Sequence, residues 1–235
     1  MAYKKPLLVE VFAQVAFEQP CPLGTILDVV QRLRNEGYPE VEIHRKDGVA
    51  VANQGLLVTN TETFWCWAAG RQRVIQISPV FIGYNQVGDY LGWSSFAESF
   101  RKLLSVTRAE LPPPITLSHN TRDALETERE GFELGCYLNC GGPVIPSSFA
   151  KIASEWDLTW GQGVPGKDEQ NTQLHAALRA RKSRLHLAMT LTKIHRVSKW
   201  DGLEDSLEPI HEGLVQLFET SITDFTRQQI MGGCK

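Results

Sequence analysis

The chain has 235 residues, of which 42% are hydrophobic and 22% are charged, and its 24 basic and 27 acidic side chains leave a formal net charge of −3. This balance is typical of a globular protein and excludes a generally polycationic nucleic-acid binder. At this length folding buries roughly 70% of the surface of the unfolded chain, so a core forms without a disulfide or metal staple. No apolar run approaches the ~20 residues that cross a bilayer, and no signal-peptide pattern is present, so we expect a cytoplasmic protein without membrane contact.

The first elements predicted along the chain are a strand, a helix and a meander. Apolar and polar residues alternate over 5–18, which predicts a half-buried strand. A capping box of Thr25 and Asp28 predicts the start of an amphipathic helix, and Gly37 predicts its end. Several strand-like segments separated by glycine or proline then predict an antiparallel meander. These segments are 41–43, 49–58, 63–67, 73–77 and 80–84.

A second amphipathic helix and a proline cluster close the first half. Ser95 and Glu98 have capping-box spacing, and we expect the helix that they begin to end near Ala109. The prolines of 111–114 cannot continue a helix. We therefore divide the chain into an N-terminal half, 1–110, and a C-terminal half, 111–235, and expect the two to form one compact unit.

The second half repeats the order strand, helix, several strands, long helix. We expect a strand at 115–120, a short helix within 122–139, an extended segment at 148–160, a turn at 161–170 and a hairpin of 174–181 with 184–194. The segment 171–183 also fits a helix, and both readings stay open. A long amphipathic helix is predicted from Ser206, with Pro209 in its first turn and an apolar stripe that reaches Phe225.

These patterns predict an α+β fold in which an antiparallel sheet, or two sheets, carries helices on one face and a long C-terminal helix. One option is two β-α-β(n)-α halves, an order that resembles saddle-shaped duplicated folds of the TATA-box-binding kind. A single long helix on a curved sheet also resembles helix-grip folds. Both are analogies of fold and imply no function.

Short segments in a set order along nearly the whole chain resemble the motifs of one family. They are KPLLVEV at 5–11, RVIQI at 73–77, GWSSF at 92–96, ITLSHNTR at 115–122, LEPIH at 207–211 and FETSIT at 218–223. In this order they resemble a sporadically distributed bacterial protein family of uncharacterised function, in which an aromatic residue is usual at the position of His119. The resemblance implies a domain of the whole length and supplies no established catalytic residue.

Motifs for metal binding and catalysis are incomplete. Cys136 and Cys140, two of five cysteines, lack the second pair or histidine pair of a structural zinc site, so we expect no metal, no cofactor and, if that segment is helical, two buried thiols. The glycines of 161–167 have P-loop spacing. However, Asp168 stands where Ser or Thr would bind magnesium, and Pro165 removes one N–H donor. No Gly-x-Ser-x-Gly elbow is present.

Charge is segregated near the C-terminus. Between 170 and 200 there are seven basic residues and no acid, and 201–224 is acidic. The two segments could neutralise each other, or the basic segment could bind an acidic partner or nucleic acid, with Arg71 and Arg73 extending the patch.

We therefore expect a non-enzymatic module of a bacterial system, with defence as one setting, that binds a protein partner or another copy of itself. The expected partner-binding residues are Arg179, Arg181, Lys182, Arg184, Arg196, Trp65 and Trp67. No catalytic residue is expected. One alternative is a nucleic-acid-binding or antitoxin-like regulator that uses the basic segment of 179–199. The other is a phosphate-handling enzyme at 161–167.

Overall fold

The computed structural model describes residues 7–52, 55–88, 90–128, 134–139, 155–165, 170–181 and 184–232. By their contacts the residues fall into two compact units. Unit 1 comprises Met1–Val9, Asn120–Ile194 and Pro209–Lys235, and unit 2 comprises Glu10–His119 and His195–Glu208. Antiparallel strands and several helices make up the described residues, so the predicted α+β fold with a C-terminal helix is confirmed.

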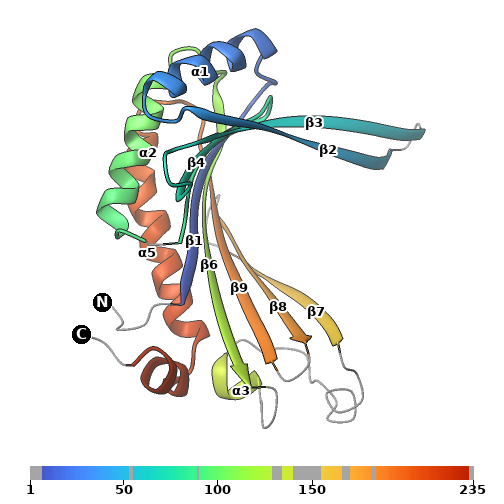
Figure 1. Ribbon diagram of the computed structural model, residues 1–235, viewed down its shortest axis with the longest axis vertical. Helices are drawn as coiled ribbons and strands as arrows, with labels where there is room; N and C mark the ends of the chain where they lie inside the picture. Colours follow the sequence, from blue (N-terminus) through green and yellow to red (C-terminus); the bar gives the residue numbers. More distant parts are fainter. Residues whose placement is uncertain are drawn as a thin grey trace. The chain divides into compact units, whose positions relative to one another are not determined.

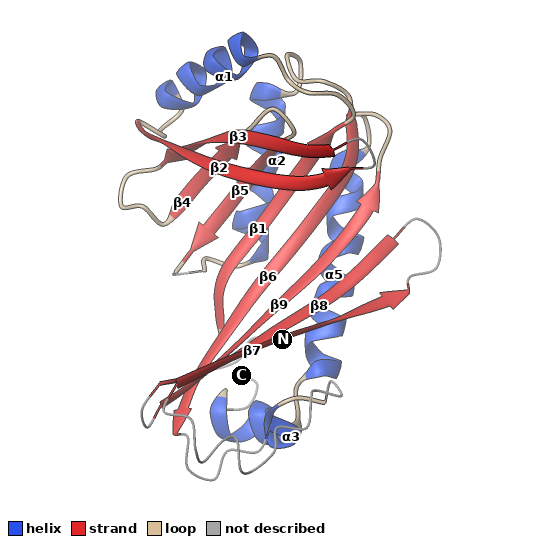
Figure 2. Ribbon diagram, turned by 90° about the vertical axis from the view of Figure 1, so that its right-hand side faces the viewer, coloured by secondary structure: helices blue, strands red, loops and turns tan. Residues whose placement is uncertain are grey.

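Unit 2 contains the first strand, two helices and a meander. The elements are β1 (Leu8–Phe17), α1 (Leu23–Asn35), β2 (Glu40–Ala52), β3 (Gly55–Trp67), β4 (Arg73–Ile77), β5 (Phe81–Val87) and α2 (Trp93–Thr107). The strand order is β2-β3-β4-β5-β1, so the first strand lies beside the last strand of the meander (Figure 2).

The two faces of this sheet have different environments. Val11, Ala13 and Val15 alternate along β1 with less buried residues, as the sequence pattern predicts. Ala13 is paired directly with Tyr84, whose ring packs against Phe96 of α2 at 5.2 Å between centroids. Helices α1 and α2 lie on this same side of the strands (Figure 1). The opposite side carries no helix of the described part of unit 2 and is called the helix-free face below.

Both helices of unit 2 start earlier than the capping boxes predict. Helix α1 begins at Leu23 after Pro22, and α2 begins at Trp93 after Gly92, and neither start has a side-chain cap. A proline already has the φ angle that a helix start needs, so Thr25 is inside the first turn instead of before it. The predicted end at Gly37 is confirmed, because this residue has φ of 98° and the Tyr38 N–H donates to the Leu33 carbonyl at 3.0 Å.

Unit 1 contains the second set of strands. Its elements are β6 (Pro114–Glu128), α3 (Leu134–Tyr137), β7 (Glu155–Pro165), β8 (Gln170–Arg181), β9 (Arg184–Arg196), α5 (Leu203–Ser221) and a π-helix (Thr226–Ile230), and the ends of β6, β9 and α5 extend into unit 2. The strand order is β6-β9-β8-β7 (Figure 2). Here too the first strand lies beside the last, and the element order strand, helix, strands, long helix occurs twice, as predicted.

The turn predictions were wrong in two places. The segment 49–58 is not one strand, because β2 ends at Ala52 and β3 begins at Gly55. The predicted turn at 161–170 includes the end of β7, where Gly161 is paired with His175 and Pro165 with Asn171. Strand β7 is at the edge of its sheet. An edge strand tolerates proline, because the N–H groups on its outer side have no neighbouring strand to bond. The pairing also resolves 170–181 as a strand.

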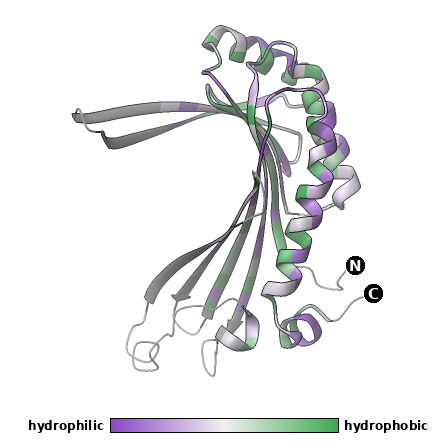
Figure 3. Cartoon of the chain, turned by 180° about the vertical axis from the view of Figure 1, so that it is seen from behind, coloured by the Kyte–Doolittle hydropathy of each residue, from purple (hydrophilic) through white to green (hydrophobic). Residues whose placement is uncertain are grey.

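A second core lies between β9 and α5. Leu185, Leu187, Met189 and Leu191 are buried at alternate positions of β9 and pack in one cluster with Leu214 of α5. In Figure 3 hydrophobic and hydrophilic residues alternate along α5.

This helix starts earlier than predicted and its apolar stripe ends sooner. It begins at Leu203, so Pro209 is inside the helix instead of in its first turn. Phe225, the expected end of the stripe, is 44% exposed and meets Tyr137 edge-on at 5.4 Å between ring centroids.

Substituting Gly83 with alanine should destabilise unit 2. An added Cβ would lie 2.5 Å from Cε2 of Phe12 and 3.1 Å from the Ala13 carbonyl oxygen, so we expect a loss of about 1–3 kcal/mol of unfolding free energy. Phe12→Leu should reduce that cost in a double-mutant cycle measured by urea denaturation. The matched control is Gly24→Ala in α1, where an added Cβ meets nothing within 4 Å. Equal effects of the two alanines would contradict the packing argument.

The buried carboxyl of Asp123 should make stability depend on pH. Burial raises its pKa from 3.8 to about 7, so the folded chain keeps this proton after the unfolded chain has released it. Stability from this group is therefore present in acid and is lost as pH rises from about 4 to about 7. Asp123→Asn should raise the unfolding free energy at about pH 8 by as much as about 4 kcal/mol relative to its effect at about pH 4. Chemical denaturation at the two pH values measures this difference, and a pH-independent effect would contradict it.

Candidate functional site

Two tryptophans of β3 lie on the helix-free face of unit 2. Trp65 and Trp67 alternate along the strand with Phe64 and Cys66, which are buried on the opposite side. Both tryptophans are half-buried. The sequence prediction that they form a partner-binding site therefore concerns side chains that are accessible and outside the core.

The two rings belong to a row of tilted rings in contact, which includes His44 of β2 and crosses the β2–β3 hairpin. The His44 ring lies 4.4 Å from the Trp65 ring, and the Trp65 ring lies 5.7 Å from the Trp67 ring, measured between centroids. Cζ of Arg71 lies 4.9 Å above the Trp67 ring, within the range of a cation–π contact. We call His44, Trp65, Trp67 and Arg71, together with Glu42, the aromatic platform.

Glu42 holds the platform together. One of its carboxylate oxygens accepts a hydrogen bond from Trp67 Nε1 at 3.2 Å and lies 3.3 Å from His44 Nε2, and the other pairs with Arg71. The hydrogen bond from Arg71, followed by that from His44, lowers the pKa of this carboxyl. Because one carboxylate ties three side chains, their rotamers are set before any partner arrives.

The backbone at Arg71 is strained. Arg71 has φ of 55°, and among the described residues it is the one non-glycine residue with a positive φ. A side chain in this region costs roughly 1–3 kcal/mol, which glycine would avoid. The turn between β3 and β4 nevertheless has arginine here, and the arginine reaches Glu42 and the Trp67 ring.

One row of residues on the helix-free face runs from Trp65 across the sheet without a charged side chain. Trp65 is paired with Gln76, Gln76 with Gly83, and Gly83 with Gln14, so these positions form one row across β3, β4, β5 and β1. Beside the platform, the Glu40 carboxylate lies 3.9 Å from Nε of Arg71, and its side chain is 56% exposed. When Glu40 is counted with the platform, two acids, Glu40 and Glu42, stand against one base, Arg71.

The predicted basic residues are distributed between the two units. Arg179 and Arg181 are on β8, Arg184 begins β9, and Lys182 lies outside the described residues. The register of β7 and β8 places Asp157 directly opposite Arg179 and Glu155 directly opposite Arg181. In this register acidic residues of β7 stand at the positions opposite these arginines, whereas the sequence analysis expected the acids of the C-terminal segment to neutralise them. Arg196, an exposed residue at the end of β9, belongs to unit 2.

Sequence reasoning missed two members of the platform, Glu42 and His44, and misplaced two arginines. The even spacing of Glu42 and His44 from Glu40 is the signal for one strand face. Arg71 and Arg73 do not extend one basic patch. Arg71 contacts Trp67 on the helix-free face. Arg73 of β4 is paired with Gln86 of β5, and Gln86 is paired with Val11, so Arg73 is on the helix-covered face.

The described residues offer little to metal or thiol chemistry. Within the described ranges, no group of three or more His, Cys, Asp and Glu side chains is arranged to hold a metal ion. Cys66 is buried, and burial raises the pKa of its thiol to about 12. Cys136, expected to be buried, is exposed on α3, and Cys140 lies outside the described residues.

The backbone at Gly161–Pro165 continues strand β7 and pairs with β8, whereas a P-loop is a loop that leads into a helix. None of the helices that the structure describes has the length and hydrophobicity needed to cross a membrane.

No protein-family model matches the chain, and no curated protein matches it in sequence. The family resemblance noted from the sequence motifs stays a prediction.

Replacing Arg71 should separate backbone strain from side-chain contacts. Arg71→Gly relieves the backbone strain but also removes the exposed contacts with Glu42, Glu40 and the Trp67 ring. These two effects oppose each other, so we expect the unfolding free energy to stay within about 1 kcal/mol of the original. Arg71→Ala loses the same contacts but keeps a Cβ at positive φ, and should be less stable than Arg71→Gly by about 1 kcal/mol. Thermal or urea denaturation of both variants measures the difference. A large loss in both would show that Arg71 is needed for folding.

Proposed function

We propose that the chain is a non-enzymatic module that binds another protein, and that the aromatic platform is the centre of its contact surface. The observation that carries the proposal is a half-exposed pair of tryptophans, Trp65 and Trp67, whose tilted rings contact each other on a face of unit 2 that no described helix of the unit covers. Tryptophan and arginine are the residues most enriched among those that dominate the binding energy of protein interfaces.

The order of the platform favours binding. Immobilising a flexible side chain on association costs about 0.5–1.5 kcal/mol, and here the Trp67 ring and the Arg71 guanidinium already have a hydrogen bond and an ion pair with Glu42. The strain at Arg71 supports the same conclusion, because a strained residue that holds an exposed contact group is typical of functional sites.

Charge favours a protein over a nucleic acid. Nucleic-acid binding depends on an excess of cations to meet phosphates, and Glu40 and Glu42 outnumber Arg71 at the platform. The uncharged row of Gln76, Gly83 and Gln14 suits the core of a protein interface, where charged residues are depleted. A protein surface with apolar side chains and a basic rim fits this arrangement. A second copy of the chain is one such protein.

Alanine at both tryptophans should strongly weaken the interaction. A tagged chain expressed in its native host is purified with its bound proteins, which are quantified by mass spectrometry. We expect Trp65→Ala with Trp67→Ala to weaken the complex by about 30-fold or more, because truncating a central anchor costs at least about 2 kcal/mol. Leu27→Ala is the matched control, since Leu27 is 48% exposed on α1. This control should leave the complex unchanged.

Other outcomes have defined meanings. A partner retained equally by the double variant, at unchanged thermal stability, would refute the platform as the contact centre. Binding of an oligonucleotide that weakens steeply with salt and with charge reversal at Arg179 and Arg181 would replace the protein-binding proposal with the nucleic-acid one. Sedimentation at several concentrations identifies self-association as the source of the complex.

A further inference from the structure

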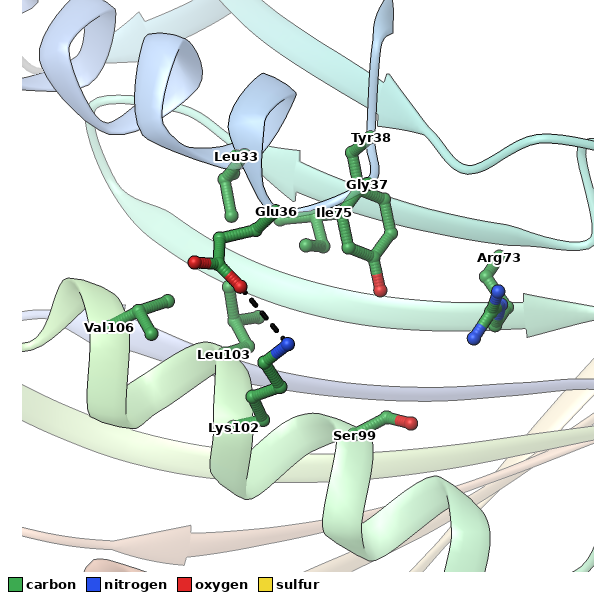
Figure 4. Close-up of a pocket in the computed structure, with 10 residues that line it drawn as sticks. All are labelled: Leu33, Glu36, Gly37, Tyr38, Arg73, Ile75, Ser99, Lys102, Leu103 and Val106. Atoms are coloured by element: carbon green, nitrogen blue, oxygen red, sulfur yellow. Dashed lines mark ion pairs between the residues drawn. The ribbon is translucent and has the colours of Figure 1, made fainter.

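A cavity of about 170 Å³ opens on the helix-covered side of unit 2, between the end of α1, strand β4 and α2. Figure 4 shows its lining residues. Leu33, Ile75 and Leu103 supply apolar surface, and Val106 adds to it from α2. Polar groups line the rest of the cavity. The arrangement of an apolar surface with a few convergent polar groups is the usual form of a small-molecule site.

Most of the polar groups around the cavity are already satisfied. Lys102 Nζ and Glu36 Oε2 form an ion pair at 3.0 Å, so they cancel each other's charge (Figure 4). The Ser99 hydroxyl donates to the Ser95 carbonyl at 2.9 Å. Burial raises the pKa of the nearby Tyr84 hydroxyl, and its neighbours Ser99 and Arg73 act in the opposite direction.

Two donors are left over. Arg73 is exposed, and among the described residues no carboxylate pairs with it. A guanidinium carries five N–H donors, so an interaction of Arg73 with Tyr84 leaves other donors available. The hydroxyl of Tyr38 has no hydrogen-bond partner within the described part of the chain, and its half-buried ring forms one wall of the cavity. Burial raises the pKa of Tyr38 to about 12, so this hydroxyl keeps its proton at any physiological pH.

We propose that this cavity binds a small carboxylate with an apolar body, in which the carboxylate accepts hydrogen bonds from Arg73 and the Tyr38 hydroxyl while the body packs on Leu33, Ile75 and Leu103. The site is separate from the aromatic platform and does not depend on the proposed function.

Charge and size define the ligand class. With Lys102 and Glu36 paired, the lining has one uncompensated positive charge, which matches one carboxylate better than a doubly charged phosphate. A cavity of about 150 Å³ admits a benzene ring, so one ring or a short branched chain fits here and a nucleotide does not. Phenylacetate has these properties and serves as the probe.

The test titrates the full chain with phenylacetate, phenylacetamide and phenethylamine, which share one body and differ in the charge of the head. Amide signals in two-dimensional NMR report the site, and thermal shift reports stabilisation. We expect saturable shifts at Gly37, Ser99 and Lys102 with phenylacetate at millimolar concentration, and weaker binding of the other two compounds. Arg73→Gln should weaken phenylacetate binding about tenfold or more, because a hydrogen bond to a charged group is lost.

Two further variants make the result decisive. Tyr38→Phe keeps the wall of the cavity and removes one donor, so it should weaken binding several-fold even if Arg73→Gln proves unstable. Arg101→Gln, at an exposed position of α2 outside the cavity, is the matched control and should bind as the original chain does. The proposal is overturned if phenylacetate fails to bind, if the amide or the amine binds equally well, or if binding survives both Arg73→Gln and Tyr38→Phe.

Discussion

The strict alternation of side chains along a β-strand is the constraint on which the organisation of unit 2 depends. Each strand must supply one row of residues to the helices and another to the opposite face. On β3 this rule buries Phe64 and Cys66 and leaves Trp65 and Trp67 on the helix-free face. Two helices cover one row and no helix of the described part covers the other, so the core and the candidate site use different side chains of the same strands.

The aromatic platform and the cavity use charge in different ways. At the platform the positive Arg71 is tied to Glu42 and to an aromatic ring, so the exposed surface is ordered and nearly neutral. At the cavity Glu36 is paired with Lys102, and no carboxylate of the described residues pairs with Arg73, so its charge is available to a ligand. Both arrangements follow from where a carboxylate happens to lie. They suit the two different partners that we propose, a protein surface in one case and a small carboxylate in the other.

The strain at Arg71 and the absence of side-chain caps on α1 and α2 show how tertiary contacts override local preference. Glycine would suit φ of 55° better, and a Ser or Thr cap would suit each helix start better. Burial of the apolar faces of α1 and α2 stabilises these helices without side-chain caps. The cation–π contact of Arg71 with Trp67 offsets part of the free-energy cost of the positive φ at Arg71.

Local sequence pattern was sufficient for the α+β class, the alternation of β1, the end of α1 at Gly37 and the presence of an amphipathic helix near the C-terminus. These features depend on periodicity within one segment, which the sequence displays directly. The convergence of Glu42, His44 and Arg71, the acids of β7 opposite Arg179 and Arg181, and the cavity beside Tyr38 were decided by tertiary structure alone. Each joins residues that are distant along the chain, and their meeting depends on strand register, which the position of each turn sets and composition does not reveal.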